Sequence, residues 1–500
     1  MLFASPLYGA FLVATWAIFW LLPSRVDRRR VARPLFLVAA SYGFYFYGTW
    51  DAARDEAVPL AAPWWAALCL AVIFVGSTLD FFIGRALARI EHRAARNALL
   101  LVSIAYYLGV LAVFKYWNFA ADAVASAAAA LGAHVNVTRL RLVLPFGISF
   151  FTFETMSYTI DVWRRELEPA RRYLDYLLFV SFFPHLVAGP IVRPSQMLPQ
   201  LAAEPRVDAA AQARGLWRIA VGLAKKIVIG DFLAQGIVNR VFATPERFTA
   251  LEVLVAVYAY AMQIYADFSG YSDVAVGSAA LFGYVLPENF DAPYLASDLQ
   301  EFWRRWHISL STWLRDYLYK PLGGSRGGSL KTYRNLMITM VLGGLWHGAS
   351  WNFVVWGALH GGALAVTRIW QRSRAVFAFS QGRTPMLATG ATRALATLAT
   401  FHFVCFAWIF FRAPTFDHAL LALRQLAHGG WTLEHVTPRV VLVVAAAAAL
   451  HVSPRAWEGR AREAFVRTPA LVQGVVLAAA AVALHLVAGA RPEPFVYGQF

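Results

Sequence analysis

Residues 336–367 read LMITMVLGGLWHGASWNFVVWGALHGGALAVT, without one Asp, Glu, Lys or Arg, and they contain the pair Trp346-His347. A helix crosses a bilayer with about 20 apolar residues, so this run is long enough to lie in a membrane. A histidine at membrane depth is costly and usually faces a protein-lined or wet cavity, where it marks a functional site. The stretch therefore predicts a helical membrane protein with a histidine site inside it.

The rest of the chain has the same apolar character. Of its 500 residues, 59% are hydrophobic and 15% are charged, whereas a soluble domain has about 25% charged residues. Further uncharged runs lie at Met1–Ser24, Pro34–Trp50, Ala57–Leu79, Ala98–Phe114, Tyr176–Val192, Val253–Ala266, Ala394–Phe411, Val440–Ser453 and Thr468–Ala490. Their even spread predicts an all-α polytopic protein with about ten to twelve spans in one membrane domain over residues 1–500.

The first run and the cysteines fit this picture. We interpret Met1–Ser24 as a retained span rather than a signal peptide, because positive charges follow the apolar stretch instead of preceding it. Cys69 and Cys405 both lie in apolar runs. They are typical of small core residues, and no disulfide or metal framework follows from them.

The formal net charge is +16, but the basic residues gather between the spans, which argues against a nucleic-acid partner. Basic connections at Arg25–Arg33, Asp80–Arg96 and Asp161–Arg172 alternate with connections poor in arginine, such as Tyr116–Thr138. Cytoplasmic loops of membrane proteins carry the excess of Lys and Arg. We therefore predict that the three basic loops are cytoplasmic and touch anionic lipid head groups, with Tyr116–Thr138 and the N-terminus outside.

Proline and glycine interrupt the apolar pattern between Tyr173 and Gly215, around His185 and Arg193. Proline removes a backbone donor and stops a helix, and broken backbone is tolerated in a membrane only within protein or beside a cavity. This segment is expected to face the protein interior. For His185 and Arg193, a functional site and a kinked span with a structured loop remain equal alternatives.

A second Trp-His pair, Trp306-His307, lies in the segment Asp298–Lys320, which reads DLQEFWRRWHISLSTWLRDYLYK. Its apolar residues recur at helical spacing, and its Trp, Tyr and Arg content suits the head-group layer. We expect an interfacial or re-entrant helix there, in which Glu301 is spaced to pair with the arginines that follow it. The densest basic cluster near the two pairs comprises Arg304, Arg305, Arg315, Lys320 and Arg326.

The surroundings of the histidines separate them into two groups. His347 lies in LGGLWHGAS at residues 342–350, where glycines let a helix or a substrate chain approach the backbone closely. With His307 as its companion, we interpret it as functional. His402, His451 and His485 lack such a setting and are interpreted as structural histidines.

Two long stretches carry a resemblance to a known family. FWRRWHISLSTWLRDYLYKPLGGSRGG (302–328) and RNLMITMVLGGLWHGASWNFVVWGALHG (334–361) resemble the membrane-bound O-acyltransferase family, most of all its bacterial alginate O-acetylation branch. The segments 144–164, 182–201, 263–284, 406–419 and 494–500 are similar to that branch as well. The last departs from the family pattern with Gly498, where an aromatic residue is expected.

The resemblance implies a fold of tilted helices, with interfacial or re-entrant helices, around a central funnel, and a catalytic core over residues 142–371. It implies that His347 is the catalytic histidine and His307 the second polar residue of the active site. It also implies acyl transfer from a cytoplasmic thioester to a hydroxyl, with an extracytoplasmic polysaccharide or a periplasmic acetyltransferase as partner. A multi-pass location in the bacterial inner membrane follows from the same family.

The chemistry of these residues agrees with that function. A hydroxyl is a poor nucleophile near neutral pH and needs a general base within hydrogen-bond reach, a role that neutral imidazole suits. We expect His347 to be this base and His307 to orient the thioester or stabilise its oxyanion. A thioester has a good leaving group, so no metal and no bound cofactor are expected besides the donor, acetyl-CoA or another acyl thioester. The basic cluster is expected to steer that negatively charged donor.

Other functions remain open. The same fold could transfer D-alanyl groups from a carrier-protein thioester to teichoic acid, although the length and the terminal PFVYGQF favour the polysaccharide branch. A proton-coupled transporter would also use intramembrane histidines, but the sequence shows no internal repeat of the kind common in transporters. A glycan polymerase or flippase would call for a carboxylate cluster on a soluble domain, which the sequence lacks.

Overall fold

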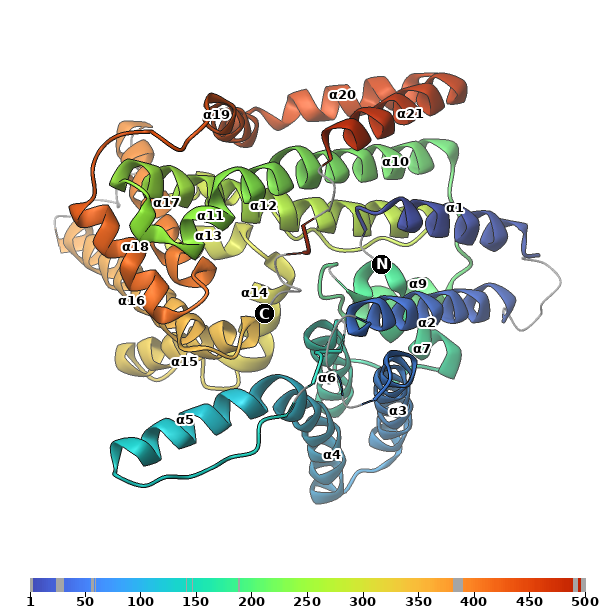
Figure 1. The fold of residues 1–500 in the computed structure, drawn as a ribbon. Coiled ribbons are helices and arrows are strands. Elements are labelled where there is room, and N and C mark those ends of the chain that lie inside the picture. Colours follow the sequence, from blue (N-terminus) through green and yellow to red (C-terminus); the bar gives the residue numbers. More distant parts are fainter. Residues whose placement is uncertain are drawn as a thin grey trace. The chain divides into compact units, whose positions relative to one another are not determined.

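The computed structural model describes residues 3–23, 31–54, 58, 60–140, 142–145, 147–187, 189–380, 390–488 and 493–495, and for residues 375–380 the backbone alone. Within these ranges every regular element is a helix (Figure 1), as expected where lipid offers the backbone no hydrogen-bond partner. The predicted all-α polytopic fold is confirmed. Most of the Arg25–Arg33 loop and of the terminal PFVYGQF, with Gly498, lies outside the described residues.

The chain divides into two compact units. Unit 1 comprises Met1–Ile219 and Tyr271–Pro287, and unit 2 comprises Ala220–Gly270 and Glu288–Phe500. The boundary passes through two helices, α10 (Ala209–Ala224) and α12 (Ala250–Leu281). The single membrane domain with a core over residues 142–371 stays a prediction.

Unit 1 holds the helices of the N-terminal half. They are α1 (Pro6–Leu21), α2 (Ala32–Ala53), α3 (Ala62–Arg89), α4 (Arg93–Leu111), the π-helix η1 (Ala112–Tyr116), α5 (Trp117–Ala130), α6 (Ile148–Arg164), α7 (Tyr173–Ser181), α8 (Phe183–Leu186) and α9 (Pro194–Ala202). The helices α3, α4 and α6 contact one another as one bundle.

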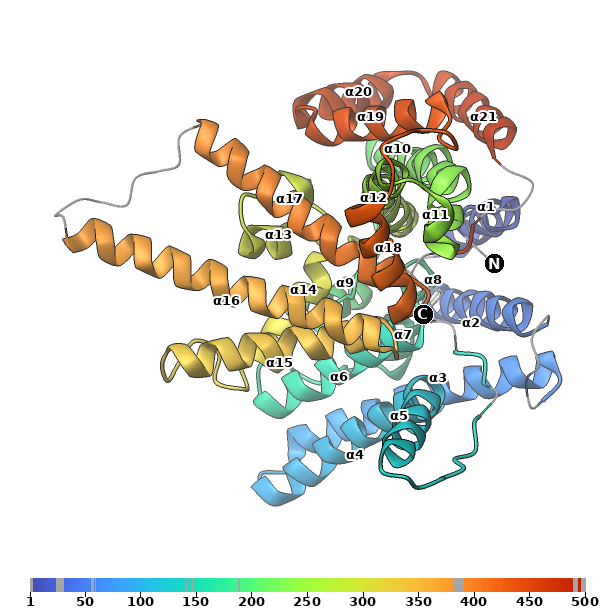
Figure 2. The same ribbon diagram turned by 60° about the vertical axis from the view of Figure 1, so that its left-hand side comes forward.

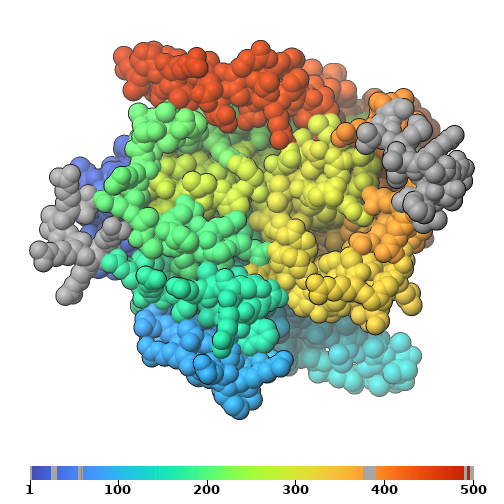
Figure 3. All heavy atoms as spheres, turned by 180° about the vertical axis from the view of Figure 1, so that it is seen from behind, coloured from blue at the N-terminus to red at the C-terminus, as the bar shows by residue number. Residues whose placement is uncertain are grey.

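Unit 2 begins with short helices and ends with long ones. They are η2 (Lys225–Asp231), η3 (Ala234–Val238), α11 (Asn239–Ala243), η4 (Pro245–Arg247), η5 (Pro293–Leu295), α13 (Leu299–Arg305), α14 (Ile308–Leu314), η6 (Arg315–Tyr319), α15 (Ser329–His347), α16 (Trp351–Ser380), α17 (Gly390–Arg412), α18 (Phe416–His428), α19 (Pro438–Val452), α20 (Arg455–Arg467) and α21 (Ala470–Val487). Figure 3 shows α19 to α21 as one red ridge of spheres.

Five helical stretches of the described residues are long and apolar enough to cross a membrane: α3, α4 through α5, α12, α17 and α21. A sixth is possible if α19 and α20, bent by 89° at their junction, form one span. The predicted number of spans, about ten to twelve, is larger than these five or six. One reason is that prolines divide some of the uncharged runs into shorter helices. The run Tyr176–Val192, for example, becomes α7 and α8, with Pro184 at the start of α8.

The uncharged run 336–367 is not one segment but a helical hairpin (Figure 2). The helix α15 ends at His347 and α16 begins at Trp351, and the two pack tightly against each other. The expectation that His347 lies in the middle of one long apolar segment is therefore wrong. His347 lies at the turn, because the chain leaves the helix at Gly348, whose φ of −162° is extended.

One buried arginine ties helix ends of unit 1 together. Arg96, in the first turn of α4, is 7% exposed and donates hydrogen bonds to the backbone oxygens of Trp163 at 2.6 Å and Ile90 at 3.2 Å. The last carbonyls of a helix have no partner inside it, and here one guanidinium serves the ends of α3 and α6. The predicted loops Asp80–Arg96 and Asp161–Arg172 are shorter than expected, because their first residues belong to α3 and α6. The connections that remain meet at one end of the bundle, as a shared cytoplasmic location requires.

Candidate functional site

A single indole ring contacts both histidines of the Trp-His pairs. The Trp346 ring centroid lies 5.0 Å from that of His347 and 6.1 Å from that of His307. Both imidazoles are buried, with His307 at 0% and His347 at 4% exposure. The fold of unit 2 therefore brings the two predicted site histidines against the same side chain.

His307 interrupts the helix that the pattern of Asp298–Lys320 predicts. The segment forms α13 and α14, and His307 lies between them in the left-handed region at φ 43°. Such strain costs about 1–3 kcal/mol and persists only where the surroundings impose it. The prediction of one continuous helix is wrong because Asn289 captures the backbone here: the N–H of Ile308 donates to the Asn289 carbonyl at 2.9 Å.

Asn289 also fixes the ring of His307. Its side-chain oxygen accepts hydrogen bonds from the backbone N–H of Ser309 at 3.2 Å and from the Ser309 hydroxyl at 2.8 Å, which identifies this atom as the acceptor. His307 Nδ1 lies 3.2 Å from the same oxygen and therefore carries the proton that it donates. In a neutral imidazole the second nitrogen, Nε2, is then an acceptor.

Burial keeps His307 neutral. The Phe268 ring stands edge-on to the imidazole at a centroid distance of 4.6 Å. Burial lowers the pKa of His307 from 6.5 to about 3, because the charged form would lose its hydration. Near neutral pH this side chain is an uncharged group whose Nε2 can accept a hydrogen bond, for example from a hydroxyl.

Aromatic rings also fix His347 at the end of α15. The rings of Trp356 and Phe411 stand edge-on to its imidazole at 5.1 and 5.2 Å, a favoured arrangement of aromatic groups. Trp356 stacks on Trp408 at 5.8 Å, and Trp408 lies 5.1 Å from Trp306, the neighbour of His307. The two histidines therefore share one continuous aromatic wall.

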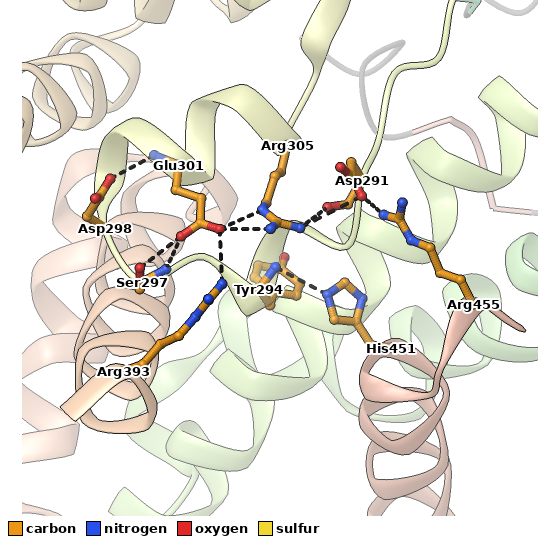
Figure 4. Close-up of polar contacts among 9 residues, drawn as sticks. All are labelled: Asp291, Tyr294, Ser297, Asp298, Glu301, Arg305, Arg393, His451 and Arg455. Carbon is orange, nitrogen blue, oxygen red and sulfur yellow. Dashed lines mark hydrogen bonds and ion pairs between the residues drawn. The ribbon is translucent and has the colours of Figure 1, made fainter. Parts of the chain in front are cut away.

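The basic cluster divides by its ion pairs. Arg305 is held in the network of Figure 4, where Glu301 accepts from Nη2 at 2.7 Å and from Nε at 3.0 Å. The carboxylate of Asp291 lies 3.8 Å from Arg305 Nη1 and also pairs with Arg455. Arg393 from α17 reaches Glu301 at 3.7 Å. Arg305 is thus part of an ion-pair network that joins helices of unit 2.

The other four basic residues are more exposed. Arg315 and Lys320 both pair with Asp316, at 3.0 and 2.8 Å. Arg304 and Arg326 are exposed and form no ion pair within the described part of the chain. Their charges are therefore the ones most available to an approaching anion.

A buried ion cluster was not anticipated from the sequence. Lys226 in η2 is 3% exposed, and its Nζ lies 2.6 Å from both Asp231 and Asp267. Asp267 directly precedes Phe268, whose ring touches His307. Ionisable groups at membrane depth are rare and usually functional. The available signal was the position of Asp267, immediately after the uncharged run that ends at residue 266.

Three other histidines, His185, His402 and His451, make contacts that hold the fold. His185 Nδ1 lies 3.1 Å from a carboxylate oxygen of Glu154, with both side chains fully buried, and the same oxygen accepts from the N–H of Val192 at 2.9 Å. His402 and His451 each hydrogen-bond to a tyrosine residue, as structural histidines do. The described ranges contain no group of three or more His, Cys, Asp or Glu placed to hold a metal ion.

Comparison with known proteins identifies a family for this chain. The family model described as MBOAT, membrane-bound O-acyltransferase family, matches residues 110–409, which include both histidines. A probable alginate O-acetylase AlgI of Azotobacter vinelandii is 37% identical over 438 residues, 87% of this chain and 79% of the relative. The peptidoglycan O-acetyltransferase of Helicobacter pylori is 34% identical over 454 residues, 85% of this chain and 80% of the relative. The teichoic acid D-alanyltransferase of Bacillus subtilis is 28% identical over 287 residues, 55% of this chain and 71% of the relative.

Proposed function

Since this chain belongs to the membrane-bound O-acyltransferase family, we propose that it moves an acetyl group from a cytoplasmic thioester donor to hydroxyls of an extracytoplasmic polysaccharide. It is an O-acyltransferase and a multi-pass protein of the bacterial inner membrane. Acetyl-CoA or another acyl thioester is the proposed donor. Transfer reaches the glycan directly or through a periplasmic acetyltransferase.

The relatives support a polysaccharide acceptor. Those named for alginate and peptidoglycan O-acetylation match 79–80% of their own length at 34–37% identity. The D-alanyltransferase matches a shorter stretch at 28% identity, so D-alanyl transfer to teichoic acid is the second candidate. The family match leaves a proton-coupled transporter without specific support.

The proposed reaction needs one proton acceptor beside the acyl carbon. His347 takes the proton of the acceptor hydroxyl while its oxygen attacks the thioester carbonyl. The C–S bond then breaks, and the thiolate recovers a proton from the imidazolium. In the tautomer set by Asn289, His307 Nε2 accepts rather than donates. We therefore assign His307 to hold the hydroxyl or the thiol, and leave the oxyanion to backbone amides.

The observation that carries this proposal is the shared contact of both histidines with Trp346. His347→Ala and His307→Ala should each lower acyl transfer by about 10²–10⁴-fold, the usual contribution of general acid–base catalysis. Because groups that act as one unit lose activity non-additively, the double variant should be little worse than the poorer single variant.

The measurement is transfer of labelled acetyl from acetyl-CoA to surface polysaccharide in membranes that contain each variant. His428→Ala, which removes an exposed histidine at the end of α18, is the control. Near-normal transfer by a well-folded His347→Ala protein would exclude His347 as the base. Fully multiplicative losses would instead assign His307 to packing.

Donor steering by the basic cluster is a separate part of the proposal. Arg304→Gln and Arg326→Gln should raise the KM for acetyl-CoA severalfold at low salt, because unpaired rim charges act on encounter with an anionic donor. Arg315→Gln should have a smaller effect, since Arg315 is already neutralised by Asp316 at 3.0 Å. If all three variants keep the wild-type KM and its salt dependence, the cluster is structural.

A further inference from the structure

A groove of about 480 Å³ opens at one end of the α3, α4 and α6 bundle in unit 1. Four arginines, one tryptophan, one asparagine and one acid line it: Arg93, Arg96, Arg164, Arg165, Trp163, Asn97 and Glu166. This volume lies within the range of about 300–1,000 Å³ that is usual for small-molecule sites. We propose that the groove binds the phosphate of an anionic phospholipid, a role that does not depend on the acyl-transfer proposal.

Two arginines of the groove lining are accessible to a ligand. Arg93 is exposed at the start of α4, and Arg165 is exposed just after α6, with a left-handed φ of 63°. Neither forms an ion pair within the part of the chain that the structure describes. The one acid of the lining, Glu166, lies 3.9 Å from Arg164, a loose pairing. Positive charge therefore exceeds negative charge where the groove meets solvent.

The electrostatics of the helix ends around the groove favour an anion. The C-terminal ends of α3 and α6 carry a partial negative charge that would repel phosphate. Arg96 offsets this charge by donating to the carbonyls of Ile90 and Trp163. The N-terminus of α4 contributes the positive end of a helix in the same place. Arginine then adds paired donors in the planar geometry that phosphate oxygens fit.

The position of the groove favours a lipid over a soluble phosphate. It lies at the start of α4, where a helical stretch long and apolar enough to cross a membrane begins, and at the end of α6. Its wall includes the half-buried Trp163, whose Nε1 donates to Asn97 at 3.1 Å. Tryptophan whose indole N–H is hydrogen-bonded and arginine whose guanidinium reaches solvent are typical of the lipid head-group layer. A phosphodiester anchored in the same layer would meet the groove at its own depth.

The test is lipid retention by the full-length protein. The purified protein in detergent micelles is mixed with phosphatidylglycerol or phosphatidylcholine, and bound lipids are counted by native mass spectrometry. The wild-type protein should retain phosphatidylglycerol in preference to phosphatidylcholine. Arg93→Gln with Arg165→Gln should weaken retention by about fivefold per arginine, roughly 25-fold together. Glu166→Gln should strengthen it.

Arg171→Gln is the matched control, since Arg171 belongs to the same basic loop but is exposed, lies outside the groove lining and pairs with Glu168 at 3.4 Å. Its phosphatidylglycerol retention should equal that of the wild type. Unchanged retention in the double variant would overturn the proposal, and an equal loss in Arg171→Gln would replace the groove with diffuse charge. If inorganic phosphate binds in a manner that requires Arg93 and Arg165 while phosphatidylglycerol does not, the ligand is a soluble phosphate and the lipid assignment is wrong.

Discussion

At the scale of single residues, the structure gives His307 a fixed state. Its backbone is left-handed at φ 43°, its Nδ1 donates to Asn289, and burial lowers its pKa to about 3. A ring so held can accept a hydrogen bond at Nε2 without reorienting, which is the preorganisation that catalysis by positioned groups requires.

This lowered pKa makes acid destabilising. The unfolded chain binds a proton at His307 below about pH 6.5, whereas the folded chain does so only near pH 3. The stability contributed by the neutral ring is therefore complete above pH 6.5 and is lost as the pH falls toward 3. Each pH unit in that window should cost about 1.4 kcal/mol. Thermal unfolding in detergent at pH 7.5 and pH 5 measures the loss, which His307→Asn should reduce.

His428→Asn serves as the control for that experiment, because the ring of His428 is exposed in the folded protein. An equal drop in melting temperature between pH 7.5 and pH 5 for wild type and His307→Asn would show that other groups dominate the acid response.

The nearness of the two candidate histidines to one site could be proposed from the sequence, but their partners could not. A Trp-His pair amid apolar residues stands out at both His307 and His347. Asn289 lies 18 positions before His307 in an irregular segment, and no periodicity connects the two. Contacts of this kind depend on the tertiary fold, which local patterns do not encode.

At the scale of elements, the hairpin of α15 and α16 depends on glycines. A Cβ at Gly357 would overlap the backbone oxygen of Met340, and one at Gly344 would overlap that of Phe353. Backbone atoms cannot turn aside as a side chain can, so added atoms here push the helices apart. The composition of the run 336–367 does not reveal this hairpin. The turn at Gly348 contains no charged residue, so the run resembles one continuous span.

Gly357→Ala should therefore lower the free energy of unfolding by about 1–3 kcal/mol, the usual cost of overpacking. It should also reduce acyl transfer, since α15 carries His347 at its end. Gly362→Ala, on the same helix, is the control: a Cβ there would meet only the methyl end of Met337 at 4.0 Å. Melting temperatures in detergent and transfer rates distinguish the two. Equal stability of both variants would contradict the close packing.

At the scale of the whole molecule, charge alternation predicts the topology, and the helix α4 bears on it. Figure 1 shows that α5 turns away from α4 after the π-helix η1, so the two do not form one straight helix. The helix α4 alone is 19 residues long, about 28 Å at roughly 1.5 Å per residue, and a bilayer core is about 30 Å thick. A single crossing by α4 would therefore put Asp80–Arg96 and Tyr116–Thr138 on opposite sides, as the charge alternation predicts.

Cysteine labelling tests this topology. Cys69 and Cys405 are both buried and are replaced first. In that background His134→Cys should react with an impermeant maleimide on intact spheroplasts, because Tyr116–Thr138 is predicted outside. Glu168→Cys, in the predicted cytoplasmic loop Asp161–Arg172, should react only after permeabilisation. The opposite pattern would invert the topology.

The helical, polytopic character could be predicted from the apolar runs alone, whereas the division into two units could not. The unit boundary passes inside α10 and α12, and each of these helices is continuous in sequence. The helical spacing of apolar residues does not show at which residue a helix stops packing against one unit and starts packing against the other. A partition of this kind follows from packing between distant segments, which composition does not record.

The ties made by Arg96 also bear on how the protein is made. During translation α3 and α4 leave the ribosome before α6, so the hairpin meets the membrane first. Arg96 has two partners close by in the chain, the carbonyls of Leu87 and Ile90, while the carbonyl of Trp163 lies 67 positions further on. The hairpin of α3 and α4 can therefore insert with the Arg96 guanidinium already bound to the carbonyls of Leu87 and Ile90. The hydrogen bond to Trp163 forms later, when α6 packs against the hairpin.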